Sequence, residues 1–86
     1  MPRKRKPEPE DKELTRQVRV LAKSVRSFRE SKTPKMSQQE LASKARLSTT
    51  TVYELEALKV ADVRLGTIIA IARALECRVS DLIDVK

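Results

Sequence analysis

Short polar side chains of the kind that contact base edges in DNA are concentrated between residues 48 and 54. They are Ser48, Thr49, Thr50, Thr51, Tyr53 and Glu54. Threonine methyl groups can contact thymine methyls, hydroxyls can bond to several base edges, and a tyrosine adds apolar area or a phosphate hydrogen bond. A glutamate either accepts from a cytosine amino group or repels the duplex through its charge. Such a set reads bases only if a helix carries it into a groove.

The sequence around this cluster predicts two short helices separated by a tight turn. Ser37 followed by Glu40 is a capping box, because the Ser37 hydroxyl can accept from the Glu40 amide while the Glu40 carboxylate accepts from the Ser37 amide. Apolar residues then recur at helical spacing, and Ser48 is placed to cap the next helix. We expect helices over about residues 38–45 and 49–57, which is the pattern of a helix-turn-helix.

The composition indicates a small, basic, all-α domain. The chain has 86 residues, of which 40% are hydrophobic but only 2% aromatic, so its core must be aliphatic. A single glycine argues against a glycine-rich phosphate loop and against a turn-rich β fold. The formal net charge of +7 attracts polyanions through counterion release, although a solubilising surface charge is the alternative interpretation.

Several other functions lack the residue types that they need. There is no histidine and Cys77 is the only cysteine, so neither an intramolecular disulfide nor a Cys/His zinc site can form within one chain. We expect no enzymatic activity, no cofactor and no metal. Cys77 is expected to be a buried, inert thiol, with a redox switch as the alternative. Because no apolar run approaches the roughly 20 residues of a membrane span and no apolar signal segment is present, we expect a soluble cytoplasmic protein.

Two different segments precede the central motif. Residues 1–13 hold three of the four prolines, a basic block and an acidic block, and we expect a disordered arm that either follows a DNA backbone or has no partner. From about residue 10 to residue 31, apolar residues at steps of four and three predict one long helix: Leu14, Val18, Leu21, Val25 and Phe28. A second stripe of this helix is basic and is either a solvated face or a phosphate contact: Arg16, Arg19, Lys23 and Arg26.

The sequence after the motif predicts a connection and two more helices. A helix over about residues 64–76 is expected to bury one face: Leu65, Ile68, Ile69, Ala72 and Leu75. A last short helix opens at Val79 or Ser80 and returns Leu82 and Ile83 to the core. The expected architecture is therefore a five-helix, all-α domain over residues 14–86, following the arm at residues 1–13.

The order and spacing of these segments resemble the Cro/C1-type (Xre-like) helix-turn-helix family of phage repressors and bacterial regulators. The resemblance covers about residues 18–83 and rests on SQQELA (37–42), Leu47-Ser48, Val52, Leu55-Glu56, Ile68, Ile71-Ala72, Ala74-Leu75 and CRVSDL (77–82). It implies a lambda-repressor-like fold, base contacts from Thr49, Thr50 and Tyr53, and a phosphate contact from Gln38. Lys59, and Lys44 or Arg46, are candidates to neutralise phosphates.

This chain departs from the family pattern at two glycine positions. Family members usually carry glycine where this chain has Arg46, since the backbone there tends to adopt positive φ, and again where it has Leu58. Arg46 therefore implies either strain or a different turn.

Two classes of function follow. The first is a transcriptional regulator that binds double-stranded DNA as a homodimer and reads an inverted repeat. The family resemblance implies that the fourth helix, the final helix and the tail form the dimer surface. Leu58, Val60 and Val63 are the expected exposed apolar residues of that surface. The alternative is a protein-binding module, such as an antiactivator or antitoxin, that sequesters another protein. The two differ in salt dependence, because DNA binding weakens steeply with added salt.

Overall fold

The computed structural model describes residues 11–83, and over this range the protein has five helices and no strand. The helices are α1 (Lys12–Glu30), α2 (Gln38–Ala45), α3 (Thr49–Glu56), α4 (Leu65–Leu75) and α5 (Val79–Leu82). The prediction of a five-helix, all-α fold is confirmed. The expected arm at residues 1–13 falls mostly outside the described residues, and the long helix predicted over about residues 10–31 is α1, Lys12–Glu30.

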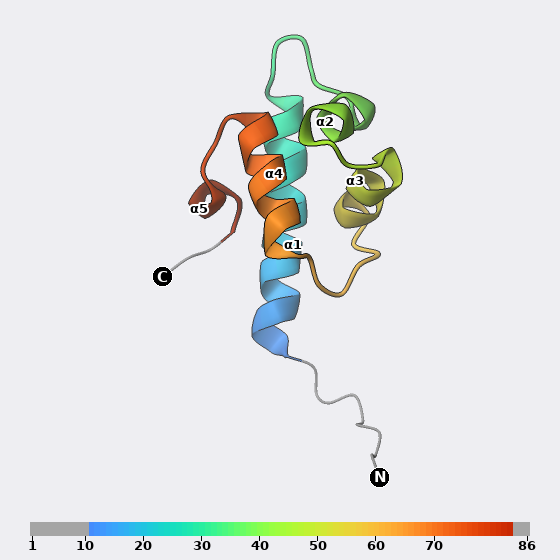
Figure 1. Ribbon diagram of the computed structural model, residues 1–86. Helices are drawn as coiled ribbons and strands as arrows, with labels where there is room; N and C mark the ends of the chain where they lie inside the picture. The colour runs from blue at the N-terminus through green and yellow to red at the C-terminus, as the bar shows by residue number, and fades with distance from the viewer. Residues whose placement is uncertain (1–10, 84–86) are drawn as a thin grey trace.

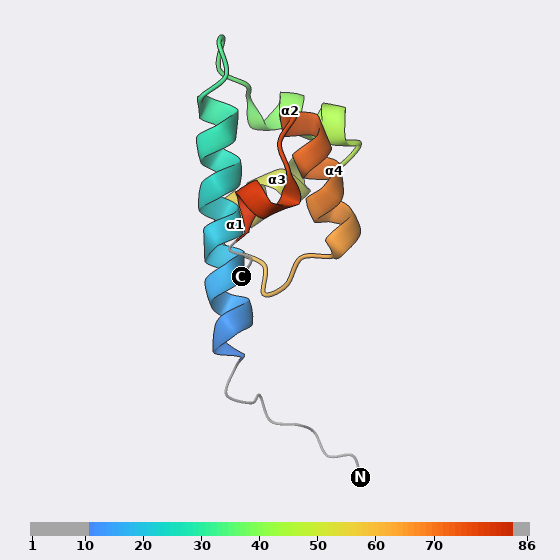
Figure 2. The same cartoon turned by 90° about the vertical axis from the view of Figure 1, so that its left-hand side faces the viewer.

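Helices α3, α4 and α5 contact the long helix α1, whereas α2 packs mainly on α3 and α4. In Figure 1, α4 lies in front of α1, with α2 and α3 on one side of it and α5 on the other. In the perpendicular view of Figure 2, α3 and α5 lie between α1 and α4, and the N-terminal end of α1 extends beyond the other helices. The helix begins where the Asp11 carboxylate accepts from the backbone amides of Glu13 and Leu14, which are unpaired donors in the first turn.

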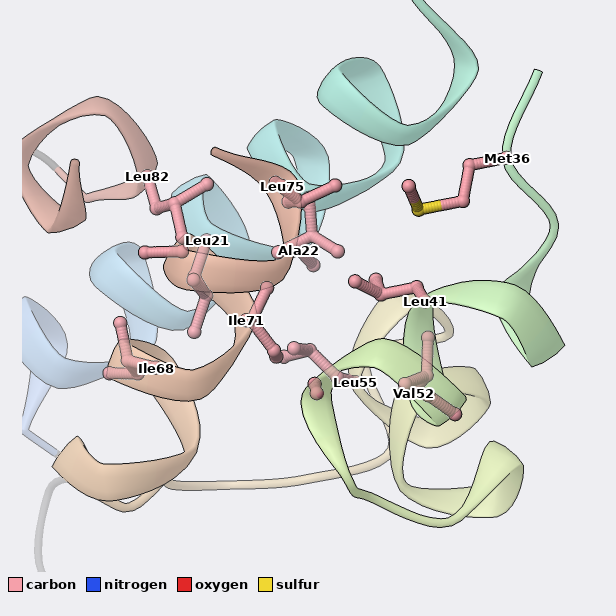
Figure 3. Close-up of a cluster of buried hydrophobic side chains, with 14 residues drawn as sticks. Leu21, Ala22, Met36, Leu41, Val52, Leu55, Ile68, Ile71, Leu75 and Leu82 are labelled. Atoms are coloured by element: carbon pink, nitrogen blue, oxygen red, sulfur yellow. The ribbon is translucent and has the colours of Figure 1, made fainter. Parts of the chain in front are cut away.

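The core is aliphatic, as the composition predicts. Leu21, Leu41, Leu55 and Ile71 are almost completely buried, and Figure 3 shows side chains from α1 to α5 meeting in this cluster. Fully burying one such side chain contributes about 1.5–3 kcal/mol. The packing of these residues holds α3 on α1, and α2 on α3 and α4, in a fixed orientation.

The buried face of α4 differs from the prediction at its edges. The buried residues are Ile68, Ile71, Ala72 and Leu75, whereas Leu65 is 64% exposed and Ile69 is 37% exposed. Positions 68, 71, 72 and 75 form one stripe of a 3.6-residue helix, whereas 65 and 69 lie at its margin. The prediction was therefore wrong for Leu65 and Ile69, and it omitted Ile71.

Three turns place a non-glycine residue in the left-handed region. Arg46, Leu58 and Glu76 have φ of 61°, 60° and 60°. At the end of α2, for example, Leu47 N donates to Ala42 O at 2.8 Å and Arg46 N donates to Ser43 O at 3.2 Å, so the last carbonyls are satisfied. Of the two alternatives for Arg46, strain or a different turn, the structure has the strained left-handed conformation. Each such residue carries roughly 1–2 kcal/mol of strain that a glycine would avoid.

Candidate nucleic-acid interface

The exposed face of α3 presents the polar cluster seen in the sequence. The helix buries Val52 and Leu55 against the core, and this orientation turns Thr49, Thr50 and Tyr53 outward. Tyr53 is 47% exposed, and within residues 11–83 neither threonine side chain makes a hydrogen bond. Two hydroxyls and an aromatic ring at the start of a helix can contact base edges without first breaking an internal bond.

The side chain of Ser48 caps the N-terminus of α3, and the Thr51 hydroxyl bonds to it. The Ser48 Oγ accepts from the backbone N–H of Thr51 at 3.0 Å, and the two side-chain oxygens lie 2.8 Å apart. The predicted cap at Ser48 is therefore present, and replacing such a cap typically costs about 1 kcal/mol. These two hydroxyls orient α3, whereas Thr49 and Thr50 are the groups left open to a ligand.

Lys59 and Tyr53 lie together at the other end of α3. The Lys59 Nζ is 5.5 Å from the centre of the Tyr53 ring, a cation–π contact, and the Lys59 backbone N–H donates to Glu54 O at 2.8 Å. The contact puts a positive charge beside the exposed face of α3. Glu54 is only half-buried, so its carboxylate adds a negative charge to the same region.

Gln38 does not point freely outward from the start of α2. Its Nε2 donates to Glu56 Oε1 at 2.9 Å, which joins the first residue of α2 to the last residue of α3. A glutamine amide carries two N–H donors, so one bond to Glu56 leaves the second available. The structure therefore places Gln38 as a link between the two helices of the motif.

Glu56 is the centre of a buried ion pair that sequence reasoning missed. Arg29 of α1 donates to it twice, from Nε to Oε2 and from Nη2 to Oε1, both at 2.8 Å. The third donor of Arg29, Nη1, bonds to Met36 O at 2.9 Å. Arg26 approaches Oε1 more loosely, at 3.5 Å. The Glu56 carboxylate and the Arg29 guanidinium together connect α1, α2, α3 and the loop before α2.

Burial alone would raise the pKa of Glu56, but the hydrogen bonds from Arg29 and Gln38 and the charges of Arg29 and Arg26 outweigh it, so the pKa lies below its ordinary value. The hydrogen bond to Glu56 raises the pKa of Arg29 in turn. Both groups are charged at neutral pH. A signal was present in the sequence, since Arg29 follows Val25 by four residues and Glu56 follows Val52 by four, which puts each on a buried face.

Other cations gather at the end of α2. Lys44, Arg46 and Arg73 line a shallow hollow of about 400 Å³ whose floor is formed by alanines of α2 and α4. Lys44 and Arg46, which were predicted as phosphate neutralisers, are exposed there. Within residues 11–83 no group of His, Cys, Asp and Glu is arranged to hold a metal ion, and no helix is long and apolar enough to cross a membrane.

Cys77 is half-buried rather than fully buried as predicted. Burial and the charge of Asp81 raise the pKa of its thiol, while Lys32 opposes them. The thiol is therefore protonated at neutral pH, the state in which a cysteine is a poor nucleophile.

Comparison with known proteins identifies the family of the chain. Residues 32–86 match the Cro/C1-type HTH DNA-binding domain. A structure described as hypothetical transcription factor NHTF from Neisseria has a TM-score of 0.70 and 28% sequence identity, and the match covers 96% of this chain and 86% of that one. No curated protein sequence matches. The family match spans α2 to α5, including the whole helix-turn-helix. The chain belongs to the family of Cro/C1-type helix-turn-helix DNA-binding domains.

Proposed function

We propose that the protein is a transcriptional regulator that inserts α3 into the major groove of an operator. The observation that carries this proposal is the outward face of α3, where Thr49, Thr50 and Tyr53 are exposed on a helix that is capped and held by the core. Lys59 adds a positive charge beside Tyr53. Membership of a DNA-binding family favours such a binding role over catalysis.

The proposed phosphate contact is made at the start of α2. The N-terminus of a helix carries free N–H groups and a partial positive charge, which suit a phosphate. Gln38 can contribute its second amide N–H while the first remains on Glu56. The contact would fix the register of α3 without reading sequence.

We further propose that two copies read an inverted repeat, with their α3 helices about one turn of DNA, or 34–36 Å, apart. Leu65 and Ile69, four residues apart on α4, are exposed apolar residues for a self-complementary contact. Of the residues first expected there, Leu58 is exposed, but Val60 and Val63 are half-buried and pack against the core. The dimer surface is thus proposed for α4 instead of the connection before it.

The test is selection of a duplex from a randomised pool, followed by fluorescence anisotropy at two salt concentrations. The double variant Thr49→Ala/Thr50→Ala should lose about tenfold or more in affinity for the selected duplex, since a good base contact contributes about 1–3 kcal/mol of discrimination. The matched control, Ser27→Ala/Ser43→Ala, removes two exposed hydroxyls from α1 and α2 and should bind like the wild type.

Two results would contradict the proposal. One is weak, unselective binding that disappears with salt and is equal in all three proteins, because this is the behaviour of basic charge alone. The other is selection of a site without two-fold symmetry by a protein that stays monomeric, which would leave α3 as the reader but remove the dimer.

A second candidate function is the binding of another protein. It is favoured by Leu58, a large apolar side chain that is 50% exposed beside the basic face of α1. Monomeric soluble proteins expose single leucines without consequence, so the surroundings of Leu58 decide its meaning.

A further inference from the structure

A groove runs between α1 and the end of α3, away from the outward face of α3. Its volume is about 410 Å³, and neither Thr49, Thr50 nor Tyr53 lines it. Apolar side chains, Val20, Ala22 and Leu58, form part of the lining. The rest is the basic stripe of α1, made of Arg16, Arg19, Lys23 and Arg26, and the carboxylate of Glu56.

The charge of this groove is strongly positive. Its cations follow one another along α1 at steps of three, four and three residues, so they form one row about 15 Å long at 1.5 Å per residue. Arg19 and Lys23 form no salt bridge within residues 11–83. The side chain of Arg26 is 56% exposed, and its only described contact with Glu56 is long. Glu56 itself is already neutralised by Arg29.

The Leu58 side chain contributes little to the stability of the fold. Its backbone has a φ of 60°, which disfavours a leucine and suits a glycine, and its side chain is half exposed. It borders both this groove and a neighbouring hollow lined by Thr15, Val18, Val60 and Ala61. Unfavourable backbone geometry that displays an apolar side chain is a reason to look for a function at that position.

We propose that this groove binds an acidic amphipathic helix of a partner protein. The apolar stripe of the partner packs on Leu58 and Val20, and carboxylates at three- and four-residue spacing pair with Arg19, Lys23 and Arg26. Charge complementarity selects an acidic partner, and the exposed leucine supplies its anchor. A DNA backbone could pair with the same cations, but its phosphates and sugars would leave Leu58 without an apolar partner. The proposal concerns a surface separate from the proposed base-reading face of α3.

The probe is a fluorescently labelled, capped helical peptide with glutamates on one face at this spacing and a leucine stripe beside them. A control peptide has serines in place of the leucines. Three variants of the full chain are compared with wild type: Leu58→Gly, Arg19→Glu/Lys23→Glu, and the charge-matched Lys35→Glu/Arg73→Glu, whose residues are exposed outside the groove. Leu58→Gly should still fold, so that its binding can be measured, because glycine suits the backbone at that position.

We expect Leu58→Gly to weaken binding of the leucine peptide by about fivefold, from the loss of one half-exposed apolar side chain, with a melting temperature equal to or above that of wild type. Arg19→Glu/Lys23→Glu should weaken it by about tenfold or more and gain affinity for a peptide with lysines in place of the glutamates. The Lys35→Glu/Arg73→Glu control should stay within about twofold of wild type.

Two outcomes would overturn the proposal. Equal binding of the leucine and serine peptides, or no effect of Leu58→Gly, would show that the apolar anchor plays no part. Loss of affinity for a DNA duplex in Arg19→Glu/Lys23→Glu, with no specific loss of the peptide, would assign the groove to the DNA backbone. Leu58→Gly should bind the DNA duplex selected through α3 as tightly as wild type does. A failure of the groove proposal is therefore distinguishable from a failure of the proposal that α3 binds an operator.

Discussion

Removing the charge of Arg29 should destabilise the protein more than any other single loss of a surface or buried cation. In Arg29→Met the apolar stem is kept, but Glu56 loses both 2.8 Å hydrogen bonds from α1. The side chain of Glu56 is 1% exposed, so water cannot replace the lost donors. Gln38 and the longer contact from Arg26 would be its remaining described partners.

The expected cost is about 3–5 kcal/mol, the usual result of leaving one member of a buried ion pair unpaired. For a chain of 86 residues this is a large part of a total stability of about 5–10 kcal/mol. At roughly 4–8 °C per kcal/mol, the melting temperature should fall by about 12–40 °C. The double variant Arg29→Met/Glu56→Met removes both charges and should recover most of the loss, since an apolar pair avoids the desolvation of the ions.

Urea and thermal unfolding followed by far-UV circular dichroism measure these free energies. Wild type, Arg29→Met, Glu56→Met and the double variant form a double-mutant cycle. Arg26→Met is the control, because this side chain is 56% exposed and its contact is long, and it should cost about 1 kcal/mol or less. A cost for Arg29→Met as small as that of Arg26→Met would refute the reasoning. So would a double variant that is less stable than Arg29→Met.

Three further predictions concern the turns, the caps and the buried carboxylate. Arg46→Gly and Glu76→Gly should each raise the free energy of unfolding in urea by about 0.5–1 kcal/mol, because relief of the left-handed strain exceeds the added entropy of the unfolded chain; a loss of stability in both would contradict this. Ser37→Ala removes the 3.0 Å bond to Glu40 N and should cost about 1 kcal/mol, whereas Ser43→Ala, at an exposed position of α2, should change stability little. The pKa of Glu56 is lowered in the folded protein, so the contribution of this carboxylate to stability is complete above the ordinary value of 4.5 and is lost as pH falls through the folded pKa. In Glu56→Gln, the free energy of unfolding should therefore depend less steeply on pH between neutral and acidic conditions.

The features that local chemistry dictates could be predicted from the sequence. The Ser37–Glu40 box and the Ser48 cap depend on hydrogen bonds between residues three apart, and both are present. The left-handed turn at Arg46 was one of two alternatives that the family resemblance left open. These signals located α2 and α3, and therefore the exposed positions of Thr49, Thr50 and Tyr53, although their contact with DNA stays a prediction.

The features that depend on distant residues could not be predicted in the same way. Glu56 and Arg29 are 27 residues apart, so the pairing becomes visible only when α1 packs on α3. Leu65 and Ile69 lie at the margin of the apolar stripe of α4, and only the packing of the other helices shows that this margin stays exposed. Gln38 was predicted as a phosphate contact, and only the fold shows that its amide also bonds to Glu56.

Because Gln38 bonds to Glu56, the two N–H protons of its side-chain amide should report on two different events. In the free protein, one of its two N–H protons bonds to a carboxylate that is almost completely buried, while the other is free to exchange with water. Nuclear magnetic resonance of that single NH₂ group should therefore show two protons with different exchange rates. Binding of a phosphate at the start of α2 would slow the second proton and leave the first unchanged, whereas opening of the core would release the first.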